Sequence, residues 1–464
     1  MTERRIKRSD CLLNSQTVLT ADKALLDCKY EAIYSWIASE ESKALIVGGP
    51  SATLRPLHAA RASATADSSS ACEEATLPSE PRNIHFQWGT CLTLELCDRI
   101  QDQHAFRNAQ YPMEAVLAAI ILCCERWAAE REGLQKENIS AEPCAAAQCT
   151  SRLPATVSGY GSLRESEGAR RLRSFDVITS RRALRCFLRF LLPHSSPYLI
   201  PFSMDVDLVG NTLLLTVLDP VKGRPLGYGI NFEERFVSPA KMCTNDKAVN
   251  ELTTLYVVQS VNLCGELKLA ISAETDALDA RFNPLRNSVA AESCCSSNKN
   301  KSSLACTFDQ QMIGSNECHV HSCKQLSLLE KQLLQDCAPL VELKTLSHFR
   351  EYPWEDTADQ MRLGGAKLLL KASHRRGTLQ TLQLVPIEHV EKQLDLNGLS
   401  GTDKWPSLVI LLKKLREIAN MVRSESSGDV ACLRLIFDGG HSLRVFNREP
   451  GTVRLSKEAV TWLA

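Results

Sequence analysis

The stretch that decides the fold is "PLVELKTL", residues 339–346. Most of it suits a buried strand, but Glu342 and Lys344 are charged. Because side chains alternate faces along a strand, these two residues point to the same side. An unpaired charge is costly to bury, so each must face an opposite charge. The pattern is compatible with a solvated salt bridge on an edge strand and with a metal site.

The composition shows no global affinity for nucleic acid or membranes. The 464 residues carry 54 basic and 54 acidic side chains, so affinity for a polyanion must come from a local patch. The longest apolar run, "AVLAAIILCC" at 115–124, is about half the ~20 residues of a membrane helix, so we expect no membrane contact. The 19 cysteines and the charged start "MTERRIKRSD" predict a reduced intracellular protein.

Patterning divides the chain into three parts. Residues 1–85 are poorly patterned and end in a linker, and residues 86–165 contain a helical segment of unknown role. Residues 166–464 form the main domain. Within it, 285–325 is polar and rich in Ser and Asn, so we expect a disordered insert. Its "CHVHSC" (318–323) has the residue types of a zinc site but no common finger spacing.

Hydrophobic periodicity predicts helices and paired strands. We expect helices over 24–37, over 113–133 with its end at Gly133, and over 407–422. We expect strands at "SMDVDLVG" (203–210), "TLLLTVLD" (212–219), "LTTLYVVQSVNL" (252–263), "ELKLAISAETDALD" (266–279), "VACLRLIFD" (430–438) and "HSLRVFNR" (441–448). "GN" at 210–211 predicts a hairpin, and Cys264-Gly265 joins the second pair.

Further acids lie where they would complete a metal site. "AISAETDA" (270–277) supplies Glu274 and Asp276 on one strand face, and "INFEE" (230–234) supplies Glu233. Two or three carboxylates hold Mg²⁺ or Mn²⁺, which polarises a phosphoryl oxygen and lowers the pKa of a bound water. A nearby lysine offsets charge that builds on the phosphate. The spacing is typical of nuclease chemistry, with solvated strand charges as the alternative.

Four segments, in order, resemble motifs of the DXO decapping exoribonuclease family, relatives of the cofactor of the nuclear 5′→3′ exoribonuclease. The similar segments are "DVITSRRAL" (176–184) for the arginine motif, "YGINFEE" (228–234) for Gly-Tyr-Lys-Phe-Glu, "SAETD" (272–276) for Gly-Glu-Val-Asp and "VELKT" (341–345) for Glu-Leu-Lys. The resemblance covers about 175–282 and 339–346, and residues 1–165 match nothing.

The resemblance implies a metal site and a substrate site. The residues implied to hold Mg²⁺ or Mn²⁺ are Glu233, Asp276, Glu342, Leu343 through its carbonyl, and Glu274 through a water. Lys344 is implied to face the attacking water, and Arg181 and Arg182 to contact the RNA 5′ end. Arginine forks match phosphate geometry, so the seven arginines of 170–189 are a phosphate-binding element or a solvated helix face.

The family implies an α/β (α+β) fold, a mixed, mostly antiparallel two-sheet core with surrounding helices and a nuclease-like metal site. It implies a hydrolase acting on capped, NAD-capped or triphosphate RNA 5′ ends, with 5′→3′ exoribonuclease activity beside it. It also implies the nucleus, with the cytoplasm as a second location, and a nuclear exoribonuclease as partner. "RRIKR" (4–8) is compatible with an import signal and with a charged terminus.

The sequence departs from the family at several positions. Ser180, Arg182, Asn231 and Ala273 replace the family's tryptophan, glycine, lysine and glycine. The Trp-x-Gln-Ser segment is missing from 367–382, where we expect a helix that begins at Lys367, breaks early and leaves a strand edge unpaired. This gap keeps open an alternative: a catalytically weak member that acts as a scaffold for RNA ends or an exoribonuclease.

Overall fold

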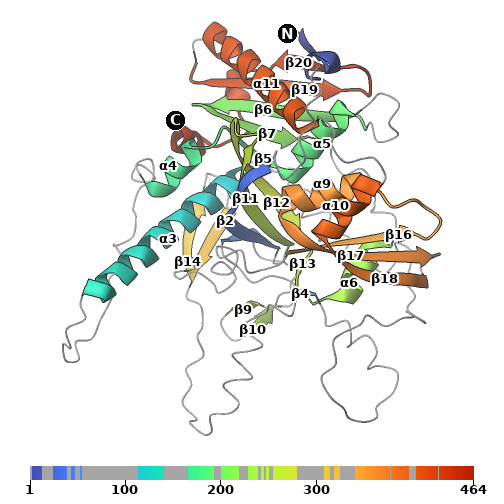
Figure 1. Ribbon diagram of the computed structural model, residues 1–464. Helices are drawn as coiled ribbons and strands as arrows, with labels where there is room; N and C mark the ends of the chain where they lie inside the picture. The colour runs from blue at the N-terminus through green and yellow to red at the C-terminus, as the bar shows by residue number, and fades with distance from the viewer. Residues whose placement is uncertain are drawn as a thin grey trace, which may run out of the picture.

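Two large sheets with helices on their outer faces make up the core of the molecule (Figure 1). The computed structural model describes residues 3–12, 25–38, 43–47, 53–54, 113–139, 166–192, 200–218, 228–238, 242–244, 247–249, 254–279, 308–313, 318–323, 340–376, 378–396, 404–426 and 428–464. Most strand pairs among these residues are antiparallel, so the predicted mixed, mostly antiparallel two-sheet α+β fold is confirmed.

The larger sheet has twelve strands within the described residues. In spatial order they are β1 (Glu3–Lys7), β20 (Ser442–Asn447), β19 (Val430–Phe437), β6 (Phe202–Val209), β7 (Thr212–Val217), β5 (Val177–Ser180), β12 (Leu267–Thr275), β11 (Thr254–Leu263), β2 (Leu25–Ala38), β3 (Lys43–Val47), β15 (Cys318–Cys323) and β14 (Phe308–Ile313). Both predicted strand pairs are confirmed. Their turns use positive φ at Gly210 (+56°) and at Cys264 and Gly265 (+53° and +71°), a backbone that glycine adopts without strain.

The smaller sheet carries the opening stretch in its interior. Its order is β18 (Thr378–Pro386), β17 (Ala366–Arg375), β16 (Leu340–Ser347), β13 (Ala277–Leu278), β4 (Thr53–Leu54) and β8 (Val237–Ser238). β16 pairs along its whole length with β17 and, at Leu340 and Val341, with β13 on its other side, so its first residues lie inside the sheet. A separate pair joins β9 (Met242–Thr244) to β10 (Lys247–Val249).

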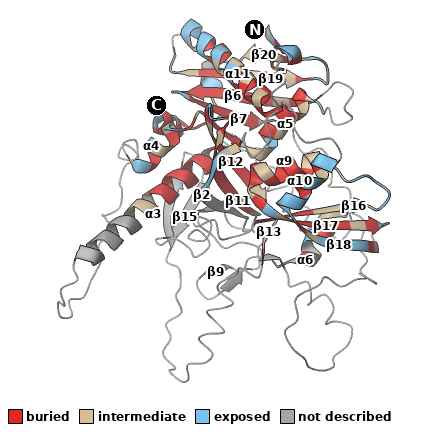
Figure 2. Ribbon diagram, viewed as in Figure 1, coloured by how far each residue is buried: buried red, intermediate tan, exposed pale blue. Residues whose placement is uncertain are grey.

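Helices cover both faces of each sheet, and most residues of β5, β6, β7 and β12 are buried as a result (Figure 2). One face of the larger sheet packs on α5 (Arg181–Leu191) and α11 (Lys404–Ser426), and the other on α3 (Glu114–Ile139), α4 (Glu167–Arg173) and α12 (Lys457–Leu463). The smaller sheet lies between α6 (Gly229–Phe236) and the pair α9 (Trp354–Gly364) and α10 (Ile387–Leu396). Short 3₁₀ helices lie at Arg8–Asp10 and Pro450–Thr452.

Two helix predictions were wrong. The helix expected over 24–37 is absent from the described residues there, because β2 (Leu25–Ala38) pairs with β11 and β3. Its Tyr, Trp and Ile side chains favour strands, and pairing on both edges prevailed over the helical spacing. α3 is present, but it continues through Gly133 to Ile139 instead of ending at the glycine.

The helix expected at Lys367 is also wrong. The chain there forms β17, and the hairpin β17–β18 leaves no gap beside β16. β14 and β15 lie inside the segment 285–325 that we expected to be disordered, and β15 pairs with β3. The rest of that segment, the linker and most of residues 1–165 lie outside the described residues. No helix in the described part of the chain is long and apolar enough to cross a membrane.

Candidate active site

The geometry of the smaller sheet brings two distant acidic motifs together. β13 pairs antiparallel with β16, with Ala277 opposite Val341, so the chain leaving β12 passes beside Glu342. At this point the Leu343 amide donates to Asp276 Oδ2 over 2.7 Å. The motifs "ETD" and "ELK" are therefore joined by a hydrogen bond from a main-chain amide to a carboxylate.

Glu342 is held between two cations. Lys344 Nζ donates to Glu342 Oε1 at 2.5 Å, and Arg181 Nη1 donates to Oε2 at 2.6 Å. Glu342 is only 2% exposed. The two strand charges do pair with each other, but a third charge, Arg181 of helix α5, completes the group, which an edge-strand salt bridge would not need.

The local sequence explains why Arg181 lies at the start of α5, from where it can reach Glu342. Ser180 caps α5, because its hydroxyl accepts from the Ala183 amide, and this makes Arg181 the first residue of the helix. From there the guanidinium reaches across to β16 and also donates to the Gln360 carbonyl over 3.3 Å. Arg181 thus joins α5, α9 and the smaller sheet.

The pKa values reflect this pairing. Burial disfavours charge on Glu342, but Lys344 and Arg181 prevail and hold its pKa at about 2. Burial likewise opposes the charge of Lys344 and Arg181, but the neighbouring carboxylates raise both pKa values. All three groups are therefore charged at neutral pH.

Asp276 and Glu233 behave in the opposite way. Burial and the negative charge of Glu342 raise the pKa of Asp276 to about 7, in spite of Lys344 and the Leu343 amide. Glu233 has a pKa well above its usual value, because of burial and of repulsion from Asp276 and Glu274. The Glu233 side chain is exposed to solvent, although many protein atoms lie around its carboxylate at longer range. The acids form a recessed group that solvent can reach.

The chemistry of this donor set fits a hard divalent cation. Glu233, Glu274, Asp276 and Glu342 interact electrostatically. Burial, and after it repulsion between these carboxylates, raises the pKa values of Glu233 and Asp276, and a bound cation would relieve the repulsion. Both oxygens of Glu342, however, already accept from a cation. Among the residues that the structure describes, no three His, Cys, Asp or Glu side chains lie close enough to hold an ion.

The expected arginine element is divided among several partners. Arg171 pairs with Glu31, whereas Arg185 and Arg189 both pair with Asp356 at the start of α9. Arg182 is exposed beside Arg181 on α5. The segment 170–189 therefore holds helices together as much as it offers charge to a substrate.

Sequence reasoning missed three residues near the site. A Cβ built on Gly364 would lie 2.9 Å from Arg181 Nη1, so this position must stay small for Arg181 to reach Glu342. The Gln360 carbonyl accepts from the same guanidinium. Burial raises the pKa of Tyr352 to about 12, and Lys344 and Glu342 act on the same group. The pair "GG" at 364–365 was the available signal.

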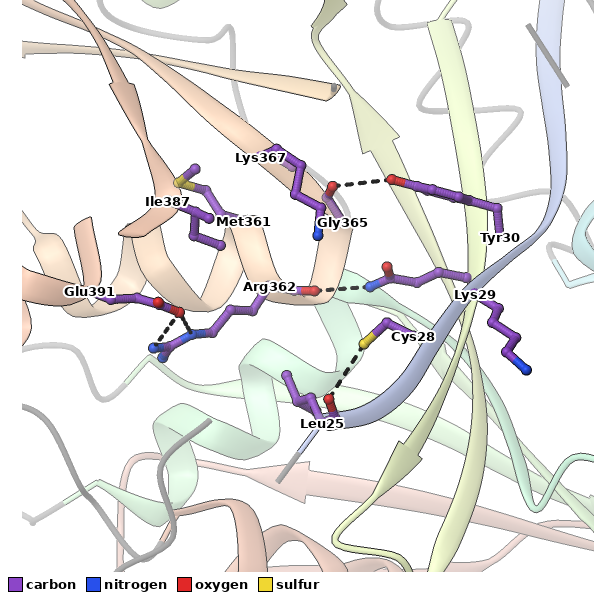
Figure 3. Close-up of a pocket in the computed structure, with 12 residues that line it drawn as sticks. Leu25, Cys28, Lys29, Tyr30, Met361, Arg362, Gly365, Lys367, Ile387 and Glu391 are labelled. Carbon is purple, nitrogen blue, oxygen red and sulfur yellow. Dashed lines mark hydrogen bonds and ion pairs between the residues drawn. The ribbon is translucent and has the colours of Figure 1, made fainter. Parts of the chain in front are cut away.

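A cavity of about 180 Å³ lies at the end of α9, and Figure 3 shows the residues around it. Tyr30 Oη donates to the Gly365 carbonyl over 3.4 Å, and the Gln259 amide donates to the Arg362 carbonyl over 3.0 Å. Arg362 also pairs with Glu391 at 3.1 Å. These contacts fix the helix end that packs Gly364 against Arg181.

The fold and the site define an α+β protein with a recessed cluster of acids, a lysine and an arginine. No family model matches the chain, and no curated protein is similar to it. Among solved structures, it is similar to K. lactis Dxo1 in complex with manganese, at 12% identity and a TM-score of 0.49 over 97% of this chain and 98% of that one.

Two Rai1 structures are also similar to the chain. S. pombe Rai1 in complex with 3′-FADP has 11% identity and a TM-score of 0.44, over 97% of this chain and 100% of that one. Candida albicans Rai1 in complex with pU5 and Mn²⁺ has 12% identity and a TM-score of 0.47, over 100% and 99%. Dxo1 and Rai1 belong to the decapping exonuclease family whose motifs the sequence resembles.

Proposed function

We propose that the protein is a divalent-cation-dependent hydrolase of RNA 5′ ends, which removes incomplete and non-canonical caps, NAD-type caps included. The observation that carries the proposal is the 2.7 Å bond between the Leu343 amide and Asp276, because it joins the two acidic motifs beside Lys344. The four sequence motifs support the same substrate class. Degradation in the 5′→3′ direction would use the same site.

Glu233, Asp276 and Glu342, with the Leu343 carbonyl, would hold the Mg²⁺ or Mn²⁺ ion, and Glu274 would bind one of its waters. When bound, the ion would supply positive charge to the phosphoryl oxygen. Lys344 contributes as a donor and not as a base, because its raised pKa keeps Nζ protonated. From its place beside Glu342 it offsets the negative charge that builds on the phosphate. Arg181 and Arg182 would contact the 5′ end.

The direct test uses purified protein with three RNAs that carry a 5′-triphosphate, an unmethylated cap or an NAD cap. Each is incubated with Mg²⁺, Mn²⁺ or a chelator. We expect release of the 5′ group with a cation and none with the chelator. Asp276→Asn should lose the activity, whereas Glu388→Gln, at an exposed acid on α10, should keep it. Equal activity of Asp276→Asn and the parent protein would contradict the proposal.

A second candidate is a scaffold that binds RNA ends, or a nuclear exoribonuclease, with little turnover. Two observations favour it: both Glu342 oxygens are engaged, and neither Gln380 nor Gln383, the two glutamines of β18, bonds to the site residues in the described part of the chain. The Gln380 amide donates to the Thr378 carbonyl within its own hairpin over 3.1 Å, and Gln383 is exposed on β18. Titration with Mn²⁺ separates the two candidates: the enzyme gains turnover with bound metal, whereas the scaffold binds RNA 5′ ends equally well with the chelator.

A further inference from the structure

An aromatic and basic surface lies at the outer end of the smaller sheet, where β16 and β17 end and β18 begins (Figure 1). We call His348, Phe349, Arg350, Arg375 and Arg376 the outer patch. All five residues are exposed, and Phe349 is 73% exposed. A large apolar side chain this open to water, with arginines around it, indicates a contact surface.

The backbone of the outer patch is fixed by hydrogen bonds. The His348 amide donates to the His374 carbonyl over 2.8 Å, and the Arg350 amide donates to the Ser347 carbonyl over 3.0 Å. Arg376 has a positive φ of +49°, which turns the hairpin between β17 and β18. The patch therefore presents its side chains from a defined frame.

Within that frame, the arginines and the aromatic ring are close together. The Arg375 guanidinium lies 5.7 Å from the centre of the Phe349 ring, and the His348 ring lies 5.8 Å from it on edge. Neither Arg350, Arg375 nor Arg376 has a carboxylate partner in the described part of the chain. The arginines of α5 around the active site, by contrast, are paired with Glu342 and Asp356.

Unpaired arginines around an exposed aromatic ring match single-stranded nucleic acid. Bases stack on aromatic side chains without regard to sequence, and arginines pair with the phosphates between them. An acidic protein surface would satisfy the charges but would not require the ring. The net charge of the whole chain is zero, so this local excess of three cations is the kind of patch that RNA affinity needs.

The outer patch belongs to the same sheet as the acids. Lys344 and Ser347 lie three residues apart on β16, a distance of roughly 10 Å along the strand. The His374 ring, which is buried behind the patch, lies 4.4 Å from the Tyr228 ring at the start of α6, the helix that carries Glu233. A chain bound at the acids could therefore continue to the patch.

From this arrangement we infer that the outer patch binds single-stranded RNA downstream of the 5′ end. Phe349 stacks on a base, and Arg350, Arg375 and Arg376 contact the phosphates on either side. The direction of the RNA rests on the proposed function, since the 5′ end is taken to lie at Glu342 and Lys344. Binding at the patch is measurable without any turnover.

The experiment measures RNA affinity by fluorescence anisotropy in the Lys344→Ala background, in which cleavage is slow, with two 5′-phosphorylated oligouridines of two and ten nucleotides. The test variants are Phe349→Ala and the double change Arg375→Glu with Arg376→Glu. The control carries the same number of charge reversals at two exposed cations elsewhere, Lys457→Glu with Lys392→Glu. Thermal unfolding verifies that all variants fold.

We expect Phe349→Ala to weaken binding of the ten-nucleotide RNA about tenfold. The double change should weaken it further and make it less dependent on salt, because two phosphate contacts are lost. Binding of the dinucleotide and of the control variant should stay within twofold of the parent value. Parent-like binding of the ten-nucleotide RNA by both test variants would overturn the inference.

The outcomes separate this inference from the proposed function. If the patch variants bind long RNA weakly and the parent protein shows no cleavage, the patch stands and the proposed hydrolysis fails. If the parent protein cleaves RNA but the patch variants bind the ten-nucleotide RNA as well as the parent does, the proposed function stands and the inference fails. If poly-glutamate binds in a patch-dependent way and RNA does not, the surface is a site for acidic proteins and the inference is wrong.

Discussion

The Leu343 amide donates to Asp276 across 67 positions of sequence, and the next residue, Lys344, reaches back to Glu342. One strand therefore supplies a hydrogen bond to one acid and an ion pair to the other. Because both contacts start from adjacent residues of β16, a change at either acid alters the electrostatic surroundings of the other.

Asp276→Asn should change how stability depends on pH. Asp276 has a folded-state pKa of about 7, raised from 3.8, so the folded protein keeps a proton that the unfolded chain releases. This contribution is complete below about pH 4 and is lost as pH rises to 7. We expect the metal-free parent to lose on the order of 4 kcal/mol more than the variant between pH 4 and pH 8, from a shift of about three pKa units.

Thermal unfolding of both proteins in a chelator measures this difference. With Mn²⁺ present the trend should reverse, because the cation binds the ionised acids and binds better as pH rises. The idea fails if parent and variant show the same pH dependence without metal.

Glu342→Gln should destabilise the protein by about 3 kcal/mol, because Arg181 and Lys344 would lose the buried anion that pairs with both. Denaturant unfolding measures the change. The matched control is Glu391→Gln, which breaks the more exposed pair with Arg362 and should cost under about 1 kcal/mol. Equal costs would show that the recessed position of Glu342 has no energetic consequence.

Lys344→Ala should slow single-turnover cleavage about 100-fold, because one donor to the developing charge is lost. Mn²⁺ affinity, measured by calorimetry, should change little. Lys371→Ala is the control, since Lys371 lies opposite Lys344 on β17 but packs over the Tyr352 and Trp354 rings at 4.6 and 4.3 Å. If Lys344→Ala cleaved RNA at a rate within twofold of the parent, Lys344 would act only as the salt-bridge partner of Glu342.

Gly364→Ala should reduce turnover without unfolding the protein. The new methyl group would lie 2.9 Å from Arg181 Nη1, so the guanidinium must move away from Glu342 and lose contact with the substrate. Gly451→Ala is the control, because no atom lies within 4 Å of its added Cβ. We expect at least a tenfold loss of kcat/KM for the first variant and none for the second. If Gly364→Ala and the parent protein had the same kcat/KM, turnover would not depend on the position of Arg181.

The strands that carry the acids could be predicted from sequence, because their signals are local. β16, β12 and the hairpin at Gly210 follow from short apolar runs and turn residues. β2 could not, since it pairs with the distant strand β11, and β17 could not, because the resemblance to the family implied a helix where the chain pairs with β16 and β18. Both segments were expected to be helical, but each pairs with a strand on both of its edges.

Some contacts of the candidate site could likewise be predicted from the sequence, and others could not. Glu342 and Lys344 share a strand face, and the alternation of side chains predicts their pairing. The contact of Arg181 with Glu342 follows from how α5 meets the smaller sheet, which no spacing encodes. Gly364 must be small because Arg181 packs against it, and this requirement is visible only when α5 and α9 are both in place. Metal ligation by Glu233, Asp276 and Glu342 stays a prediction.

β1 at the edge of the larger sheet has a consequence for biosynthesis. Arg4 donates to Asn447, 443 positions away, and β1 pairs with β20 from Glu3 to Lys7. A ribosome must therefore release almost the whole chain before the sheet can close, and the contact order of this pairing is as high as the length allows. Until then β1, which is made first, lacks its partner strand and can pair with other nascent chains. Chaperone demand during synthesis should be set by this first strand and not by the site.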